Sequence, residues 1–160
     1  MTPILIGVLA VLGMLSVAAG VMVPAYLRQR IPWKKTPGGH TYHAVGTTSV
    51  AVLDVRIMSA FILLREHADF SAETLLRAQR EVKIIIQRVN QWSSPLHGTN
   101  VAGLARGTTI DVGANLAALC HELAHVCEFI EGGAEKQDAT HASWAKRGIQ
   151  RAVDEYEAMA

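Results

Sequence analysis

The longest uninterrupted apolar stretch lies at the amino end of the chain. No charged side chain occurs from Pro3 to Leu27. At about 1.5 Å per residue, a helix over this stretch would reach roughly 37 Å, more than the ~30 Å hydrocarbon core of a bilayer. The pattern predicts a transmembrane anchor within residues 1–30 that contacts the lipid bilayer through residues 3–27. A cleaved signal peptide is the alternative, because Val17–Ala19 supplies small residues, although no Lys or Arg precedes the stretch.

Positive charge borders this stretch on its carboxyl side, at Arg28, Arg30, Lys34 and Lys35. The positive-inside rule therefore predicts a single-pass protein whose C-terminal domain is cytoplasmic. A periplasmic or exported domain, or a virion membrane, is the alternative.

The composition of the chain changes after residue 30. Residues 31–47 contain two prolines and a Gly-Gly pair, which predicts a linker and places the folded domain at 48–160. Apolar residues recur at helical spacing from Ser49 to His67, without Gly or Pro, and predict a buried helix. Ser71 is a candidate N-cap for a second helix that ends near Trp92.

One feature of that second helix conflicts with the prediction, since Ile84–Ile86 is a β-branched triplet typical of a strand.

Residues 100–112 predict a short β-hairpin. A third helix follows, capped by Asn115 and closed by Gly132 and Gly133. A fourth is expected from Ala139 to about Ala158, with Asp138 as its cap. We expect an α+β fold that is mainly helical, with the hairpin before the third helix.

Composition narrows the possible functions. The chain has 160 residues, enough for one domain, and its 15 Lys and Arg residues nearly balance 14 Asp and Glu residues. The basic residues are scattered, so nucleic acid is not an expected partner. Cys120 and Cys127 lie about 10 Å apart along the predicted third helix, too far for a disulfide, and are expected to be reduced and packed.

The sequence HELAH at residues 121–125 is an H-E-x-x-H motif within the predicted third helix. Residues four apart lie one turn above each other, so the imidazoles of His121 and His125 can face one metal ion. Glu122 is then placed to act as general base on a zinc-activated water. Two surface histidines beside a solvated glutamate are the alternative.

A catalytic zinc usually takes three protein ligands, so a third is needed. The spacing of the metzincins fails, because Glu128 and Glu131 stand where that pattern has Gly and His, and both glutamates are expected to face solvent. The Gly-Gly turn allows the chain to reverse, and His141 is the predicted third ligand. Asp138, Glu155 and Glu157 remain alternatives.

Together, HELAH and the segment THASWAKRG at residues 140–148 resemble the SprT-like zinc metallopeptidases and their small zincin relatives. In that group the motif is followed by a histidine that begins a helix, with an aromatic residue three positions later, where this chain has Trp144. The resemblance covers residues 99–150. It implies a zincin-like fold, Zn²⁺ held by His121, His125 and His141, and catalysis by Glu122.

Two departures limit the resemblance. Ala142 stands where the group usually has Gly, and no zinc ribbon or basic nucleic-acid-binding tail follows. The sequence therefore predicts a membrane-anchored zinc metallopeptidase acting on a peptide or protein, with the strand at Gly107–Val112 pairing with extended substrate. An inactive accessory subunit of a membrane or virion assembly, or an exported cell-wall peptide hydrolase, is the alternative. Tyr156 is expected in the core rather than at the site.

Overall fold

The computed structural model describes residues 32–93, 100–133 and 140–159. The chain divides into two compact units, Met1–Pro32 and Trp33–Ala160. The helices and strands named below all belong to the second unit.

The second unit is a small α/β domain built on a mixed sheet. Its five-stranded sheet has the order β1-β2-β3-β7-β6, in which β2, β3 and β7 are parallel and the two outer pairings are antiparallel. The strands are β1 Lys34–Lys35, β2 Thr41–Ala44, β3 Lys83–Ile86, β6 Gly103–Arg106 and β7 Thr109–Val112, and a separate pair is formed by β4 Trp92–Ser93 and β5 Asn100–Val101.

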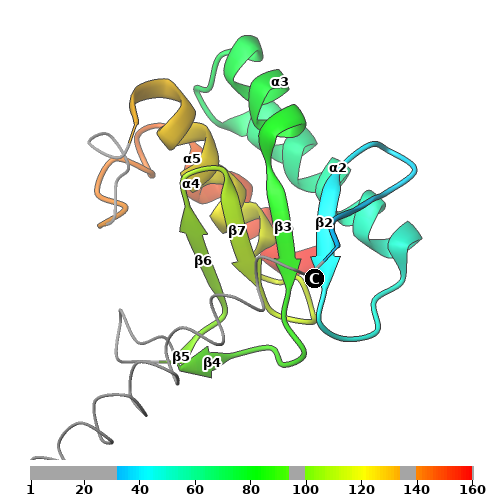
Figure 1. The fold of residues 1–160 in the computed structure, drawn as a ribbon. Helices are drawn as coiled ribbons and strands as arrows, with labels where there is room; N and C mark the ends of the chain where they lie inside the picture. Colours follow the sequence, from blue (N-terminus) through cyan, green and yellow to red (C-terminus); the bar gives the residue numbers. More distant parts are fainter. Residues whose placement is uncertain (1–31, 94–99, 134–139, 160) are drawn as a thin grey trace, which may run out of the picture. The chain divides into compact units, whose positions relative to one another are not determined.

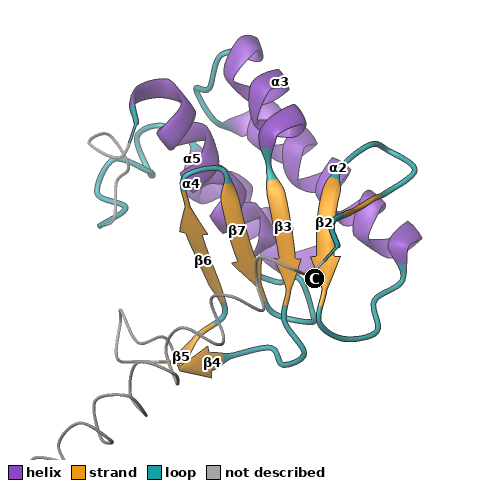
Figure 2. Cartoon of the chain, viewed as in Figure 1, coloured by secondary structure: helices purple, strands orange, loops and turns teal. Residues whose placement is uncertain are grey.

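Four described helices accompany the sheet: α2 Val50–His67, α3 Ala72–Glu81, α4 Leu119–Gly132 and α5 Ile149–Met159. They gather on one face of the sheet, behind it in the view of Figures 1 and 2. Helix α4 contacts both β6 and β7 as well as the other three helices, so it occupies the centre of this layer.

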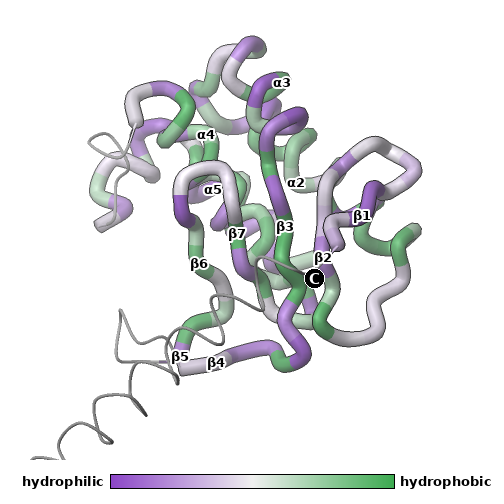
Figure 3. The backbone as a smooth tube through the Cα atoms, viewed as in Figure 1, coloured by the Kyte–Doolittle hydropathy of each residue, from purple (hydrophilic) through white to green (hydrophobic). Residues whose placement is uncertain are grey.

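The expectation of a mainly helical α+β fold is wrong, and the reason lies at Ile84–Ile86. These residues form the central strand β3 instead of the end of a helix, and Ile84 and Ile86 are fully buried. A run of β-branched residues suits a strand, and the alternation of buried Ile84 and Ile86 with the partly buried Ile85 shows that one face of β3 packs on the core. Figure 3 shows the change from hydrophilic residues at the end of α3 to hydrophobic residues along β3.

The hydrophobic spacing and the capping residues predicted some helix boundaries correctly and others wrongly. The helix expected over residues 49–67 is confirmed as α2, but it is buried on one face only, and Val52 and Val55 are exposed. Ser71 does cap α3 by accepting a hydrogen bond from the Thr74 N–H at 3.0 Å. Helix α3 ends at Glu81, well short of Trp92. The stretch expected as a linker contributes β1 and β2 to the sheet.

The fourth helix also begins later than expected. Residues 140–148 form turns, and α5 starts at Ile149. Gly148 has φ +73°, a left-handed conformation that interrupts a right-handed helix. The hairpin expected before the third helix is present as β6 and β7, joined at Gly107 with φ +61°.

The predicted membrane anchor requires correction. Within the described ranges, no helix combines the length and the apolar character needed to cross a bilayer. The predictions of a transmembrane helix and of a single-pass membrane location are therefore not upheld. Residues 3–27, on which those predictions rested, lie outside the described residues.

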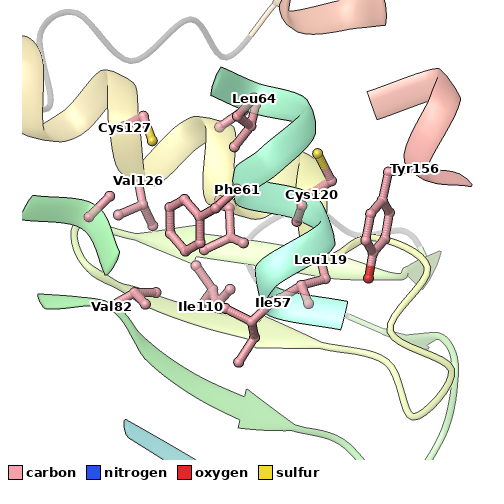
Figure 4. Close-up of a cluster of buried hydrophobic side chains, with 14 of the residues drawn as sticks. Ile57, Phe61, Leu64, Val82, Ile110, Leu119, Cys120, Val126, Cys127 and Tyr156 are labelled. Atoms are coloured by element: carbon pink, nitrogen blue, oxygen red, sulfur yellow. The ribbon is translucent and has the colours of Figure 1, made fainter. Parts of the chain in front are cut away.

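The hydrophobic core lies between the helices and the sheet. Ile57, Phe61 and Leu64 of α2 meet Leu119 and Val126 of α4 above the strands (Figure 4). Tyr156 of α5 joins this core, as expected, and its hydroxyl donates to the Leu116 carbonyl at 3.2 Å. This packing fixes α4 between the sheet and the other helices.

Candidate metal centre

The three histidines singled out by sequence lie together in the structure. His121, His125 and His141 each offer one ring nitrogen, and these nitrogens lie within 4.8 Å of one another. Nε2 of His125 and Nε2 of His141 are 3.0 Å apart. Within the described residues, this is the group that could hold a metal ion.

Helix α4 places the first two histidines. His121 and His125 are separated by four residues, so their rings lie one above the other with centroids 5.1 Å apart. His125 is buried and His121 is partly exposed, although the residues of α4 on both sides of this pair are buried. The packing of Leu119, Leu123 and Val126 determines which face of α4 carries the histidines.

The third histidine comes from the turn segment 140–148. His141 has φ +57°, an uncommon conformation for a residue with a side chain and one that often marks a functional position. Its carbonyl accepts a hydrogen bond from the Trp144 N–H at 3.1 Å, which closes the turn. His141 therefore reaches the other two from a tight turn, and not from the start of a helix as expected.

The indole ring of Trp144 packs against the imidazoles of His121, His125 and His141. Its indole is almost fully buried, and its ring centroid lies 4.2, 4.8 and 4.9 Å from those of His141, His125 and His121 respectively. This packing limits how far the three imidazoles can rotate. Because the indole is apolar on its faces, it also shields that side of the group from water.

The electrostatics favour the neutral form of His121. Burial lowers the pKa of His121 to about 4, and the neighbouring His141 adds to this shift. A neutral imidazole presents a lone pair, which is the form that binds a metal ion.

Glu122 lies beside the histidines without belonging to the ligand group. Burial raises the pKa of its carboxyl to about 8; a backbone hydrogen bond from Ala105 opposes the shift, and the charge of Asp111 adds to it. A carboxyl with a pKa near neutrality can both accept and return a proton.

Strand β6 approaches Glu122 closely enough to require a glycine. A Cβ added at Gly103 would lie 2.6 Å from Glu122 Cγ and would meet the carboxyl group as well. The edge strand and the Glu122 side chain are thus packed directly against each other.

Glu128 is the site residue that the sequence interpretation placed wrongly. It is only 1% exposed, although solvent exposure was expected. Its Oε2 lies 3.3 Å from Nδ1 of His125, and its Oε1 accepts from Nε1 of Trp144 at 3.0 Å. The spacing of three residues from His125 on one helix was the available signal, because such residues are neighbours on the helix surface.

Arg147 connects this carboxylate to its surroundings. Its guanidinium contacts Glu128 at 3.4 Å, Glu131 at 2.8 Å and Asp69 at 2.9 Å. Although burial works against it, the pKa of Arg147 is raised, because Glu131 and Asp69 favour the charged form. The backbone N–H of Asp69 also donates to the Arg147 carbonyl at 3.0 Å. The turn segment is therefore held both to α4 and to the loop between α2 and α3.

The alternative third ligands are not in the group. Glu155 pairs with Nε2 of His67 at 2.9 Å, on the other end of α5 from the turn segment, and Glu157 is exposed. Asp138 lies outside the described residues. Cys120 and Cys127 are buried free thiols, and burial raises the pKa of Cys120 to about 12, which makes it a poor ligand.

The histidine group could hold a metal ion. Tetrahedral coordination with metal–nitrogen distances of 2.0–2.1 Å separates two ligand nitrogens by about 3.3 Å. The His125 and His141 nitrogens are 3.0 Å apart, and all three nitrogens lie within 4.8 Å of one another. Three imidazole nitrogens, one of them on a ring that faces a buried carboxylate, are donors of the kind that several transition metals accept. Comparison with known proteins adds no family assignment, since no family model, curated protein or solved structure matches the chain.

Proposed function

We propose that the protein is a zinc-dependent metallopeptidase that hydrolyses peptide bonds. The observation that carries the proposal is the convergence of His121, His125 and His141 beside the buried carboxyl of Glu122. Three protein ligands leave one position open for substrate or water, as in catalytic zinc sites, whereas structural sites use four. The resemblance of residues 99–150 to SprT-like peptidases agrees with this choice of metal and reaction.

Each residue has a distinct task in the proposed reaction. His121, His125 and His141 would hold Zn²⁺, which supplies Lewis-acid activation of water and of the scissile carbonyl. Glu122 accepts a proton from the attacking water and passes it to the leaving amine. Burial raises the pKa of Glu122 to about 8, which favours the step in which the protonated carboxyl gives its proton to the leaving amine; acceptance of the proton from water requires the ionised form. Trp144 keeps bulk water away from one side of the histidines.

The substrate would bind along β6, and this revises the strand expected for that role. Residues 109–112 form β7, which is paired on both sides by β3 and β6. Strand β6 is the last strand in the sheet order and lies against α4 beside Glu122. An extended peptide can pair with such an edge through its backbone, which favours recognition of unfolded or extended segments over small molecules.

The test begins with the full chain, purified without chelators and loaded with one equivalent of Zn²⁺. Cleavage of an unfolded protein and of a quenched fluorescent peptide library is measured for wild type and Glu122→Gln. The glutamine variant should retain zinc and lose about 10²–10⁴-fold in rate. His43→Asn, which changes a histidine of β2 outside the group, should match wild type in both properties.

Two results would contradict the proposal. A zinc-loaded wild type that cleaves neither substrate would make this a metal-binding domain without peptidase turnover. Cleavage that survives in Glu122→Gln at the wild-type rate would show that the activity comes from another site or a contaminant.

A further inference from the structure

Glu128 carries an inference that rests on the proposed function and deepens it. We infer that Glu128 is a positioning residue: its buried carboxylate sets the tautomer and ring orientation of His125 so that Nε2 is presented to the metal. It also holds the turn segment of His141 against α4. The one carboxylate would thus align two of the three ligands, which come from separate parts of the chain.

The contacts of Glu128 show why a carboxylate is needed there. Two groups donate to Oε1, the Trp144 indole at 3.0 Å and the Arg147 guanidinium at 3.4 Å. Nδ1 of His125 faces Oε2 at 3.3 Å. An ionised carboxylate only accepts hydrogen bonds, so Nδ1 of His125 must carry the proton. Its Nε2 then presents a lone pair on the side that faces His141.

The same contacts reach the third ligand. Trp144 and Arg147 follow His141 in one turn segment, and both are bonded to Glu128. Arg147 is bonded in addition to Asp69 and Glu131, so its charge is shared among three carboxylates. If the Glu128 charge is removed, Asp69 and Glu131 still hold Arg147. An effect of that substitution on zinc binding can therefore be assigned to Glu128 and not to the loss of all ion pairs of Arg147.

A glutamine at this position cannot satisfy the same partners. Its side-chain amide offers one oxygen and one NH₂ group, so a donor would replace one carboxylate oxygen. If the NH₂ group faces His125, the imidazole must move its proton to Nε2, the nitrogen needed for the metal. If it faces Trp144, the indole N–H loses its acceptor and the turn segment is released.

The experiment compares Glu128→Gln with the matched control Glu131→Gln in the full chain. Both substitutions remove a carboxylate that bonds to Arg147, but Glu131 is 27% exposed. Zinc affinity is measured by competition with a chromophoric chelator. The expected result is a 10–100-fold weaker affinity for Glu128→Gln and a change of less than threefold for Glu131→Gln. Equal effects of the two variants, or no effect of either, would overturn the inference.

A second measurement needs no substitution at Glu128. Long-range ¹H–¹⁵N spectra of the zinc-free wild type report which nitrogen of each histidine carries the proton. His125, assigned by its loss in His125→Asn, should have the proton on Nδ1. A proton on Nε2 would overturn the inference even if Glu128→Gln fails to fold.

The two readouts also separate this inference from the proposed function. Weak or absent peptidase activity with the expected zinc affinities would reject the proposed reaction and leave the role of Glu128 intact. A wild type that binds no zinc would reject the metal centre, and the His125 tautomer would still decide whether Glu128 orients that ring.

Discussion

Gly103 of β6 and Glu122 of α4 are packed so closely that no side chain fits between them. A Cβ on Gly103 would stand 2.8 Å from Glu122 Cδ, and this distance is shorter than side-chain carbons tolerate. Glu122 is 5% exposed and receives a backbone hydrogen bond from Ala105 on the same strand. The position of the proposed general base is therefore set by the edge strand as well as by its own helix.

The first prediction is that Gly103→Ala lowers peptidase activity much more than it lowers zinc binding. The three atoms nearest to the new methyl group all belong to Glu122, so its carboxyl is the group displaced. We expect at least a tenfold loss in kcat/KM, with zinc stoichiometry still near one. Rates on the peptide library and metal content by mass spectrometry measure the two effects.

Gly46→Ala serves as the control for Gly103→Ala. Its added Cβ would lie at an ordinary 3.6 Å from the Arg88 Cα, away from the site. A similar loss of activity in both glycine variants would show that the effect is general destabilisation.

The second prediction is that His141→Asn abolishes tight zinc binding while the domain stays folded. Asparagine tolerates the left-handed backbone found at φ +57°, so the substitution tests the ligand with little added strain. Circular dichroism should match wild type, and zinc should be lost on dialysis. Retention of one zinc by this variant, as in His43→Asn, would exclude His141 as a ligand.

The sequence predicted which three histidines lie together better than it predicted the fold around them. The H-E-x-x-H spacing is local, so two histidines of α4 could be placed on one helix face directly. His141 was found by looking for a third ligand after the Gly-Gly turn. Its left-handed turn was not foreseen, because the capping signal at residue 138 favoured a helix through this segment. Gly148, with φ +73°, is the residue that excludes such a helix.

Two errors had a common cause in tertiary contacts. Ile84–Ile86 carries a local strand signal, but its apolar residues also continue the helical spacing of α3, and its pairing with β2 and β7 decides for the strand. Glu128 is a charged residue that local sequence assigns to solvent. Its burial depends on Trp144 and Arg147, which lie sixteen or more residues away. Periodicity within one helix carries no information on either partner.

The third prediction concerns the turn before β2, where Asp54 of α2 accepts hydrogen bonds. Its Oδ2 accepts from the Gly38 N–H at 2.8 Å, and its Oδ1 lies 3.1 Å from Nδ1 of His40. Although burial acts to raise it, the pKa of Asp54 is lowered by hydrogen bonds from Thr36, Gly38 and His40. A depressed pKa means that folding favours the charged carboxylate.

Asp54→Asn should therefore reduce the free energy of unfolding by about 1 kcal/mol near pH 7. The stabilisation by Asp54 is complete above its unfolded pKa of about 4 and is lost as the pH falls through the lower folded value. The difference in free energy of unfolding between wild type and Asp54→Asn should therefore disappear as the pH falls below the folded pKa of Asp54. Urea unfolding at several pH values measures this difference, and a difference that grows towards acid pH would contradict the assigned direction.

The fourth prediction is that Gly148→Ala destabilises the domain and loosens the metal centre. Gly148 ends the turn segment of His141, has φ +73°, and its added Cβ would collide with the backbone carbonyl of His67 at the end of α2. Left-handed strain and the collision together should cost about 2–4 kcal/mol. Since the carbonyl belongs to the backbone, the turn segment must shift, and zinc affinity should fall with it.

Gly39→Ala separates the two causes of this loss. Gly39 has φ +88°, but an added Cβ there meets no atom within 4 Å. It should cost only about 1–2 kcal/mol and leave zinc affinity unchanged. Unfolding of the zinc-free proteins in urea gives the stabilities, and chelator competition gives the affinities. If Gly148→Ala is no worse than Gly39→Ala in either measurement, then the contact between the turn segment and α2 does not support the metal centre.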